Sequence, residues 1–165
     1  MRLKVRASKS TYFVGERAEV EIEFINLMEK TLCFPVPAQD CEDSDTGDLL
    51  TFTSFVETEE RDWFHCHRDG GGIPRDKVLS EIQEHWIKLA PNAVYTTAPY
   101  AAYGTLDKSG QWELIAHYHP PEGAFDRDYR DHLQSAAAKA GCTLPTADVF
   151  SPTVTVTAIS PSEKK

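Results

Sequence analysis

The segment Ala18–Ile25 reads AEVEIEFI and alternates strictly between apolar and acidic residues. Successive side chains of a β-strand point to opposite faces, whereas a helix brings together positions three and four apart. The pattern therefore predicts a strand with one buried apolar face and one solvated acidic face. Asn26 follows as a turn residue and ends this strand.

Other short segments repeat this period of two or are rich in β-branched and aromatic residues. They predict strands at Arg2–Arg6, Leu49–Val56, Trp86–Leu89, Val94–Thr97, Gln111–Tyr118 and Thr153–Ile159, with Trp63–His67 extending or pairing with the second of these. Turn residues separate them. About seven or eight regularly spaced strands favour an all-β fold, an antiparallel β-sandwich.

One helix is predicted within this β pattern, over about 126–140. Its apolar residues recur at helical spacing: Phe125, Tyr129, Leu133, Ala136 and Ala140. Gly141 can end it in the left-handed conformation. The segment Pro74–Trp86 fits either a short helix or an irregular stretch, and both alternatives stay open.

Proline residues indicate where regular pairing is interrupted. Pro35 confines Thr31–Val36 to an edge or an irregular segment, and Ala98–Tyr103 is expected to be a connection. The length suits one domain over 1–160, with 161–165 as a frayed tail.

The formal net charge of −9 disfavours nucleic acid and anionic membranes, and no segment is apolar enough for membrane insertion. A basic protein partner is compatible with this charge, and so is a purely solubilising role. The start of the chain lacks the apolar core of a signal peptide. We expect a cytoplasmic protein, or a periplasmic or secreted one if a signal was removed.

Five stretches together resemble the immunoglobulin-like (E-set type) β-sandwich domains of bacterial proteins: YFVGERAEVEIEFIN, LTFTSFVE, WIKLAPNAVYT, SGQWELIAHY and FSPTVTVTAI. That family has an Asn closing its second strand, matched by Asn26. It has a Leu-x-Pro-Gly turn, matched at Leu89–Asn92 with Asn92 in the Gly position. Its penultimate strand carries a pattern matched by Gly110, Trp112, Leu114 and Tyr118. The resemblance implies an accessory or inhibitor-like domain and does not choose between these roles.

Four cysteines are present: Cys33, Cys41, Cys66 and Cys142. None is spaced as in a zinc knuckle, and three disulfide connectivities are compatible with the sequence. We expect Cys33–Cys41 and Cys66–Cys142 if the compartment is oxidising. Four reduced, buried thiols are the alternative.

Two His-x-His pairs are candidate metal ligands. They are His65 with His67, and His117 with His119. Residues two apart share a face of a strand, so two such pairs on neighbouring strands could hold zinc or copper. Solvated histidines at strand ends are the alternative. The metal site therefore requires the two strand ends to be adjacent.

The chain contains no motif of nucleophilic, zinc-peptidase or phosphate-binding enzymes, so we expect no catalytic residues and no enzyme. Aromatic residues instead suggest a recognition surface. The candidates are Trp63, Phe64, Tyr95, Tyr100 and Tyr103. Core packing is the alternative role for aromatics, and we assign it to Trp112, Tyr118, Phe24 and Phe52.

Three insertions, Cys33–Asp48, Trp63–Trp86 and Pro120–Phe150, exceed the length of ordinary connections. We therefore expect a protein-binding domain of inhibitor, immunity or accessory type that acts through them. A zinc or copper protein and a carbohydrate-binding or spacer module are the alternatives.

Overall fold

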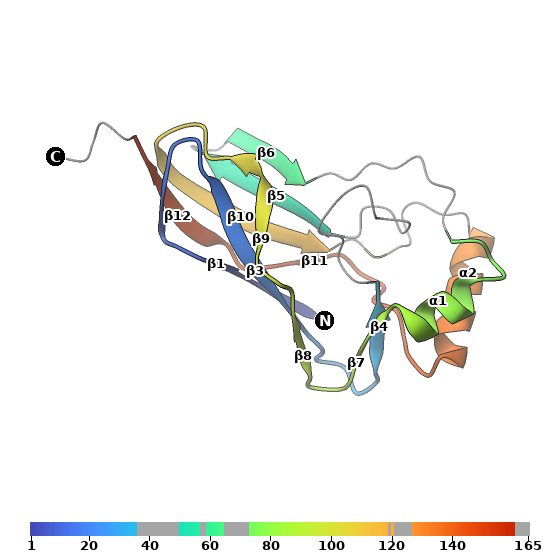
Figure 1. Cartoon of the computed structure of the whole chain (residues 1–165). Coiled ribbons are helices and arrows are strands. Elements are labelled where there is room, and N and C mark those ends of the chain that lie inside the picture. The colour runs from blue at the N-terminus through green and yellow to red at the C-terminus, as the bar shows by residue number, and fades with distance from the viewer. Residues whose placement is uncertain (36–49, 57–58, 65–72, 119, 121–126, 161–165) are drawn as a thin grey trace.

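The strict alternation at 18–25 is realised as strand β3 (Arg17–Ile25), whose four apolar side chains are fully buried. The computed structural model describes residues 1–35, 50–56, 59–64, 73–118, 120 and 127–160, with the backbone alone at 50–56, 59–64, 100–104 and 127. In Figure 1, β3 runs through the middle of one layer, between β1 and β9.

The first sheet is built around β3. Its order is β1 (Arg2–Ala7), β3 and β8 (Val94–Thr96), and β9 (Tyr100–Thr105) also pairs with β3. All of these pairings are antiparallel. Cations of β1 face glutamates of β3 on the outer side, where the Arg6 guanidinium lies 2.7 Å from a Glu23 carboxylate oxygen.

The second sheet packs against the first. Its order is β2 (Thr11–Phe13), β12 (Val154–Ile159), β10 (Gly110–Tyr118), β5 (Leu50–Val56) and β6 (Glu59–Phe64). β11 (Val149–Phe150) pairs with the end of β10. Only β2 and β12 are parallel among these pairs. Strand β1 contacts β10, β11 and β12 across the interface between the sheets.

The core of the sandwich lies between the two sheets and is rich in large rings. Trp112, Leu114, Ala116 and Tyr118 point inward from β10, as their alternation predicts. The Phe24 and Phe34 rings stack with centroids 4.9 Å apart, and Tyr118 meets both rings edge-on. Burial raises the pKa of Tyr118 because the phenolate would lose its hydration.

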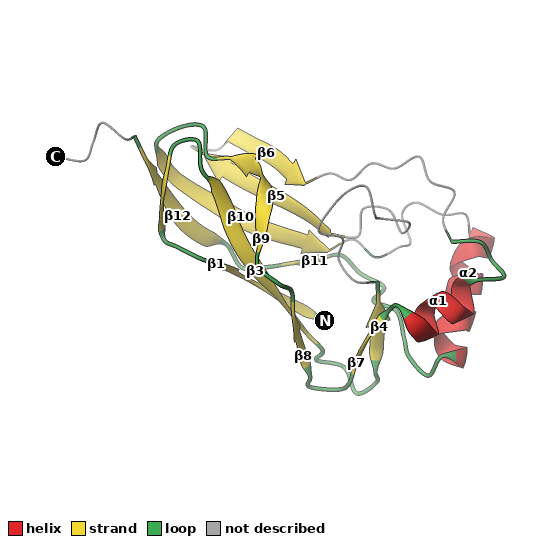
Figure 2. Cartoon of the chain, viewed as in Figure 1, coloured by secondary structure: helices red, strands yellow, loops and turns green. Residues whose placement is uncertain are grey.

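Two helices and a small sheet lie beside the sandwich (Figure 2). The sheet pairs β4 (Leu32–Phe34) with β7 (Ile87–Leu89), and the helices are α1 (Val78–Glu84) and α2 (Arg127–Lys139). Neither described helix has the length and apolar character needed to cross a membrane.

The chain is thus mostly β, with two helices and several sheets that do not close into a barrel. The predicted helix at 126–140 is α2, and Gly141 ends it with φ +80°. The ambiguous segment before Trp86 contains a second helix, α1, so the expectation of one helix is wrong. Its two buried residues, Val78 and Ile82, pack against α2 and supply the apolar contact that a short helix needs.

One further expectation is corrected. Ala98–Tyr103 is not a connection, because β9 begins there and gains backbone hydrogen bonds from β3. The segment around Cys33 is an edge strand, as expected: β4 pairs with β7 in a two-stranded sheet, and its other side has one isolated bridge, between Leu32 and Thr143. Pro35 follows directly after β4 and therefore costs no ladder hydrogen bond.

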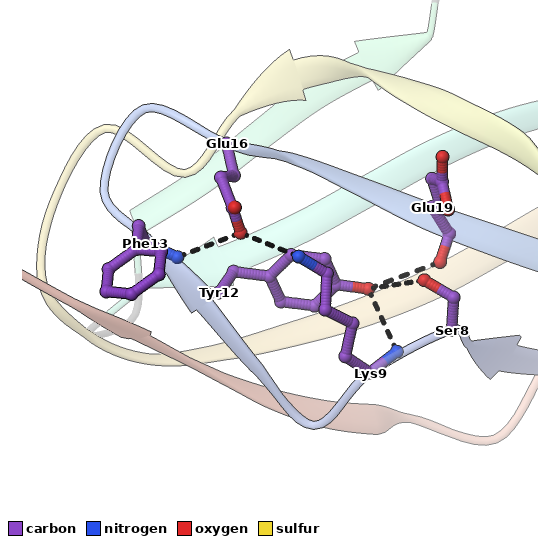
Figure 3. A network of polar contacts seen from close by, with 6 residues as sticks. All are labelled: Ser8, Lys9, Tyr12, Phe13, Glu16 and Glu19. Carbon is purple, nitrogen blue, oxygen red and sulfur yellow. Dashed lines mark hydrogen bonds and ion pairs between the residues drawn. The ribbon is translucent and has the colours of Figure 1, made fainter.

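The Tyr12 hydroxyl, on β2, joins the β1–β2 connection to β3 (Figure 3). It donates to the Glu19 carbonyl oxygen at 3.3 Å and lies 3.3 Å from the Ser8 hydroxyl. The backbone N–H of Lys9 donates to it at 3.4 Å. These contacts fix the β1–β2 connection against β3.

Glu16 makes further contacts with the β1–β2 connection and with β2 (Figure 3). One of its carboxylate oxygens accepts from the Lys9 ammonium at 2.9 Å and from the Phe13 backbone N–H at 3.0 Å. These two hydrogen bonds favour the charged carboxylate and hold the pKa of Glu16 below its ordinary value.

Candidate functional site

The helical parts of the second and third predicted insertions meet in one place, which we call the helical lobe (residues 73–86 and 127–144). The lobe has its own buried cluster, separate from that of the sandwich, consisting of Cys33, Ile73, Val78, Ile82, Trp86, Tyr129, Leu133, Ala136, Ala137, Cys142 and Leu144. Because the cluster joins residues of the second and third insertions with Cys33 of β4, the lobe is one folded unit, seen beside β4 in Figure 1.

A disulfide joins the helical lobe to the small sheet. Cys33 of β4 is bonded to Cys142, which follows α2, and their Cα atoms are 5.7 Å apart. Since a cysteine forms only one disulfide, the expected pairings Cys33–Cys41 and Cys66–Cys142 are both wrong. Cys41 and Cys66 lie outside the described residues.

Backbone pairing explains why these two cysteines meet. The Cys33 N–H donates to the Thr143 carbonyl at 2.9 Å, and the Thr143 N–H donates to the Thr31 carbonyl at 2.9 Å. This short parallel bridge places Cys33 and Cys142 side by side. The sequence contains no pattern that would reveal a pairing over so long a separation.

Helix α2 holds the segment before α1 through two hydrogen bonds. The Tyr129 hydroxyl donates to the Ile73 carbonyl at 2.9 Å, and His132 Nε2 lies 2.8 Å from the Arg75 carbonyl oxygen. A carbonyl only accepts, so His132 carries its proton on Nε2 in this contact. Burial raises the pKa of Tyr129 above its ordinary value.

Sequence reasoning placed Tyr129 on the apolar stripe of the helix and did not identify His132. Their partners are backbone carbonyls more than fifty residues earlier in the chain. We call the two hydrogen bonds from Tyr129 and His132 the clamp. No side-chain pattern identifies a backbone carbonyl as an acceptor, so the clamp could not have been found from the sequence.

The outer surface of the helical lobe is polar and of mixed charge. Its exposed residues include Glu84 on α1 and Asp128, Asp131, Ser135 and Lys139 on α2. The acidic excess lies elsewhere in the sequence. Residues 40–69 hold ten acidic and two basic residues, which is −8 of the net charge of −9. This segment covers most of the first insertion and the start of the second.

His117 is the one predicted metal ligand that the structure describes. Its Nε2 lies 3.4 Å from an Asp148 carboxylate oxygen, and its ring stacks on Phe150 with centroids 3.8 Å apart. These contacts join β10 to β11. His65, His67 and His119 lie outside the described residues, and the described part contains no group of three metal-ligating side chains.

The strand order bears on that predicted site. Strand β6, which ends just before His65, is separated from β10 by β5. Two strand spacings amount to about 10 Å between the β6 and β10 backbones. The two strand ends are therefore not neighbours in the sheet, although the metal site itself stays a prediction.

Tyr95 is the one predicted binding aromatic whose side chain the structure describes. It is half-buried, and its ring lies 6.1 Å from Phe24 and 6.3 Å from Phe34. Burial raises the pKa of Tyr95. Tyr100 and Tyr103 belong to β9, and Trp63 and Phe64 to β6, where the structure describes the backbone alone, as it does for Phe52 of β5.

Comparison with known proteins identifies no matching family model and no matching curated protein. The fold is similar to two solved structures. One is the sporulation control protein Spo0M from Bacillus subtilis (TM-score 0.45, 8% identity), over 95% of this chain and 48% of that chain. The other is red sea bream transglutaminase (TM-score 0.34, 11% identity), over 96% of this chain and 15% of that chain. This chain thus spans less than half the length of each.

Proposed function

We propose that this chain is a non-enzymatic protein-binding domain of inhibitor, immunity or accessory type, and that it binds through the helical lobe and the insertions that adjoin it. We further propose that its sandwich is of the immunoglobulin-like E-set class. Asn26 at the end of β3 and Asn92 in a turn with φ 62° support this class. So do Trp112 and Tyr118, both buried on β10.

The observation that carries the proposal is the convergence of the second and third insertions into one unit, which a disulfide links to Cys33 of β4. Ordering a long connection costs conformational entropy, and ordered long loops in compact domains are usually functional. The lobe is held by the Cys33–Cys142 bond and by the clamp from Tyr129 and His132. A rigid surface loses less entropy on binding a partner.

The charge distribution supports a basic partner. The segment 40–69, which includes β5 and β6 of the second sheet, carries almost all of the net negative charge. A concentrated field of one sign steers an oppositely charged protein toward the site and speeds association. Association with the partner is then expected to slow markedly as ionic strength rises.

The Cys33–Cys142 disulfide also supports an oxidising compartment, because disulfides are rare where glutathione keeps thiols reduced. We therefore favour the periplasmic or secreted alternative over the cytoplasmic one. Thiol titration of protein isolated from its native host tests this choice.

Charge reversal on the helical lobe tests the binding proposal. The variant Glu84→Lys/Asp131→Lys changes one exposed residue on each helix and leaves the buried cluster intact. Immobilised wild-type protein captures partners from the native host, and each captured protein is then measured by surface plasmon resonance. We expect the lobe variant to bind a basic partner at least about tenfold more weakly.

The control is Glu113→Lys, a charge reversal at an exposed residue on β10 of the second sheet. It should leave the affinity unchanged. Equal loss of affinity in both variants would indicate a nonspecific charge effect, and unchanged affinity in the lobe variant would contradict the proposal.

A further inference from the structure

A cluster of exposed apolar side chains lies at the tip of the first sheet, away from the helical lobe. Among the residues whose side chains the structure describes, four large apolar ones are exposed, and three of them belong to this tip: Leu27, Met28 and Val94. Leu27 and Val94 are each 53% exposed and Met28 is 41% exposed. We call these three residues the apolar tip.

Backbone pairing brings the apolar tip together. Val94 on β8 lies opposite Ile25 on β3, in the last paired row of the sheet. One residue further, the Asn26 N–H donates to the Ala93 carbonyl at 3.1 Å. Leu27 and Met28 leave β3 directly after this bond, so the loop and β8 present their apolar side chains at the same end of the sheet.

Asn26 fixes the loop that carries Leu27 and Met28. Its side chain is fully buried, and its amide donates to the Lys30 carbonyl at 2.9 Å and to the Leu89 carbonyl at 2.8 Å. Its side-chain oxygen accepts from the Met28 N–H at 2.9 Å. The exposed side chains therefore stand on a fixed backbone, which lowers the entropy cost of binding.

The charges around the apolar tip are opposite in sign to those of the whole chain. Arg2 lies opposite Ile25 on β1, and Lys30 is exposed on the loop that carries Leu27 and Met28. Glu29 is the exposed acidic residue within the loop. Two cations and one carboxylate thus border the apolar tip, which gives it a net positive charge on a protein whose net charge is −9.

We propose that the apolar tip is a second binding site, and that it binds a protein segment with apolar anchor residues flanked by carboxylates. Apolar contacts with Leu27, Met28 and Val94 would supply the anchor, and Arg2 and Lys30 would form the polar rim. Fixed apolar side chains surrounded by complementary charge are the usual arrangement of a binding hot spot. The site is independent of the helical lobe, since β4 and β7 lie between them (Figure 1).

Selection of random twelve-residue peptides on the immobilised wild-type chain tests this proposal. Peptides that also bind the variant Leu27→Ser/Val94→Thr are discarded. We expect the remaining sequences to combine leucine-like residues with Asp or Glu. Measured by fluorescence anisotropy, a selected peptide should lose about tenfold in affinity for this variant and for Arg2→Glu/Lys30→Glu.

Two matched controls accompany these variants. Phe150→Ser removes an apolar side chain that is 61% exposed on the other sheet, and Lys139→Glu reverses an exposed charge on α2. Both should bind the peptide as the wild type does. The side-chain amide resonances of Asn26 show whether each tip variant keeps its folded loop, so loss of fold is distinguished from loss of binding.

Three outcomes would overturn the proposal: enriched peptides that are basic, no enrichment over the variant, or affinity lost equally in the controls. A dimer seen by sedimentation that Leu27→Ser/Val94→Thr dissociates would assign the tip to a second copy instead. The lobe variant Glu84→Lys/Asp131→Lys should keep peptide affinity, so this site and the proposed function can fail separately.

Discussion

Cys33 is bonded to Cys142 across a separation of 109 residues, which ties the middle of β4 to the end of α2. Both cysteines lie in the buried cluster of the helical lobe, at 0% and 7% exposure. The bond therefore fixes the lobe to the small sheet from the inside and is shielded from solvent.

Removal of this disulfide should destabilise the chain. We expect Cys33→Ala/Cys142→Ala to lower the free energy of unfolding by about 2–5 kcal/mol, because the unfolded chain regains the freedom of a very long loop. Urea denaturation at pH 7 measures the change. The control is Cys41→Ala/Cys66→Ala, which spares the bond. An unchanged free energy of unfolding in the first variant would contradict this prediction.

The clamp from α2 should stabilise the helical lobe locally. Tyr129→Phe removes the donor to the Ile73 carbonyl, and we expect a cost of about 1 kcal/mol. Hydrogen exchange should show faster exchange at α1 amides and unchanged exchange in β3 and β10. Tyr12→Phe is the control, because it removes a hydroxyl from the sandwich and should leave α1 unaffected. Unchanged exchange at the α1 amides together with faster exchange in β3 and β10 would refute the clamp.

Glu16 should contribute to the pH dependence of stability. Its pKa is lowered by the hydrogen bond from Lys9, then by that from the Phe13 N–H, and lies below the ordinary 4.5. A lowered folded pKa contributes stability that is present above 4.5 and is lost as the pH falls through the folded value.

We therefore expect Glu16→Gln to weaken the fall in stability below pH 4.5. Denaturation midpoints between pH 2 and 7 measure this fall, with Glu113→Gln as the exposed control for which no such change is expected. Parallel pH curves for the wild type and Glu16→Gln would exclude the contribution of this carboxylate.

His117 provides a test between a structural and a metal-binding role. Because its ring stacks on Phe150 and its Nε2 faces Asp148, we expect His117→Ala to lower the free energy of unfolding by about 1–2 kcal/mol. Elemental analysis after incubation with zinc should give equal metal content for the variant, the wild type and the control His85→Ala. One zinc per wild-type chain that only His117→Ala loses would establish the metal site instead.

The sequence by itself determined the strands that bury one face. In β3 and β10, burial of every second side chain is the main contribution that favours a strand. The alternation of apolar and polar residues in the sequence therefore identified both strands and their inward residues. The same reasoning located α2 from its apolar stripe and Gly141 as its end. These features depend on neighbours within the same segment, and a single sequence records them.

Only the tertiary structure decided the cysteine pairing, β4, β9 and the helical lobe. Strand β9 exists because β3 offers it backbone partners, and α1 because Val78 and Ile82 can pack against α2. Cys33 and Cys142 meet because Thr143 pairs with the backbone of residues 31–33. Each of these depends on backbone groups or surfaces that lie far away in the sequence, where side-chain patterns carry no signal.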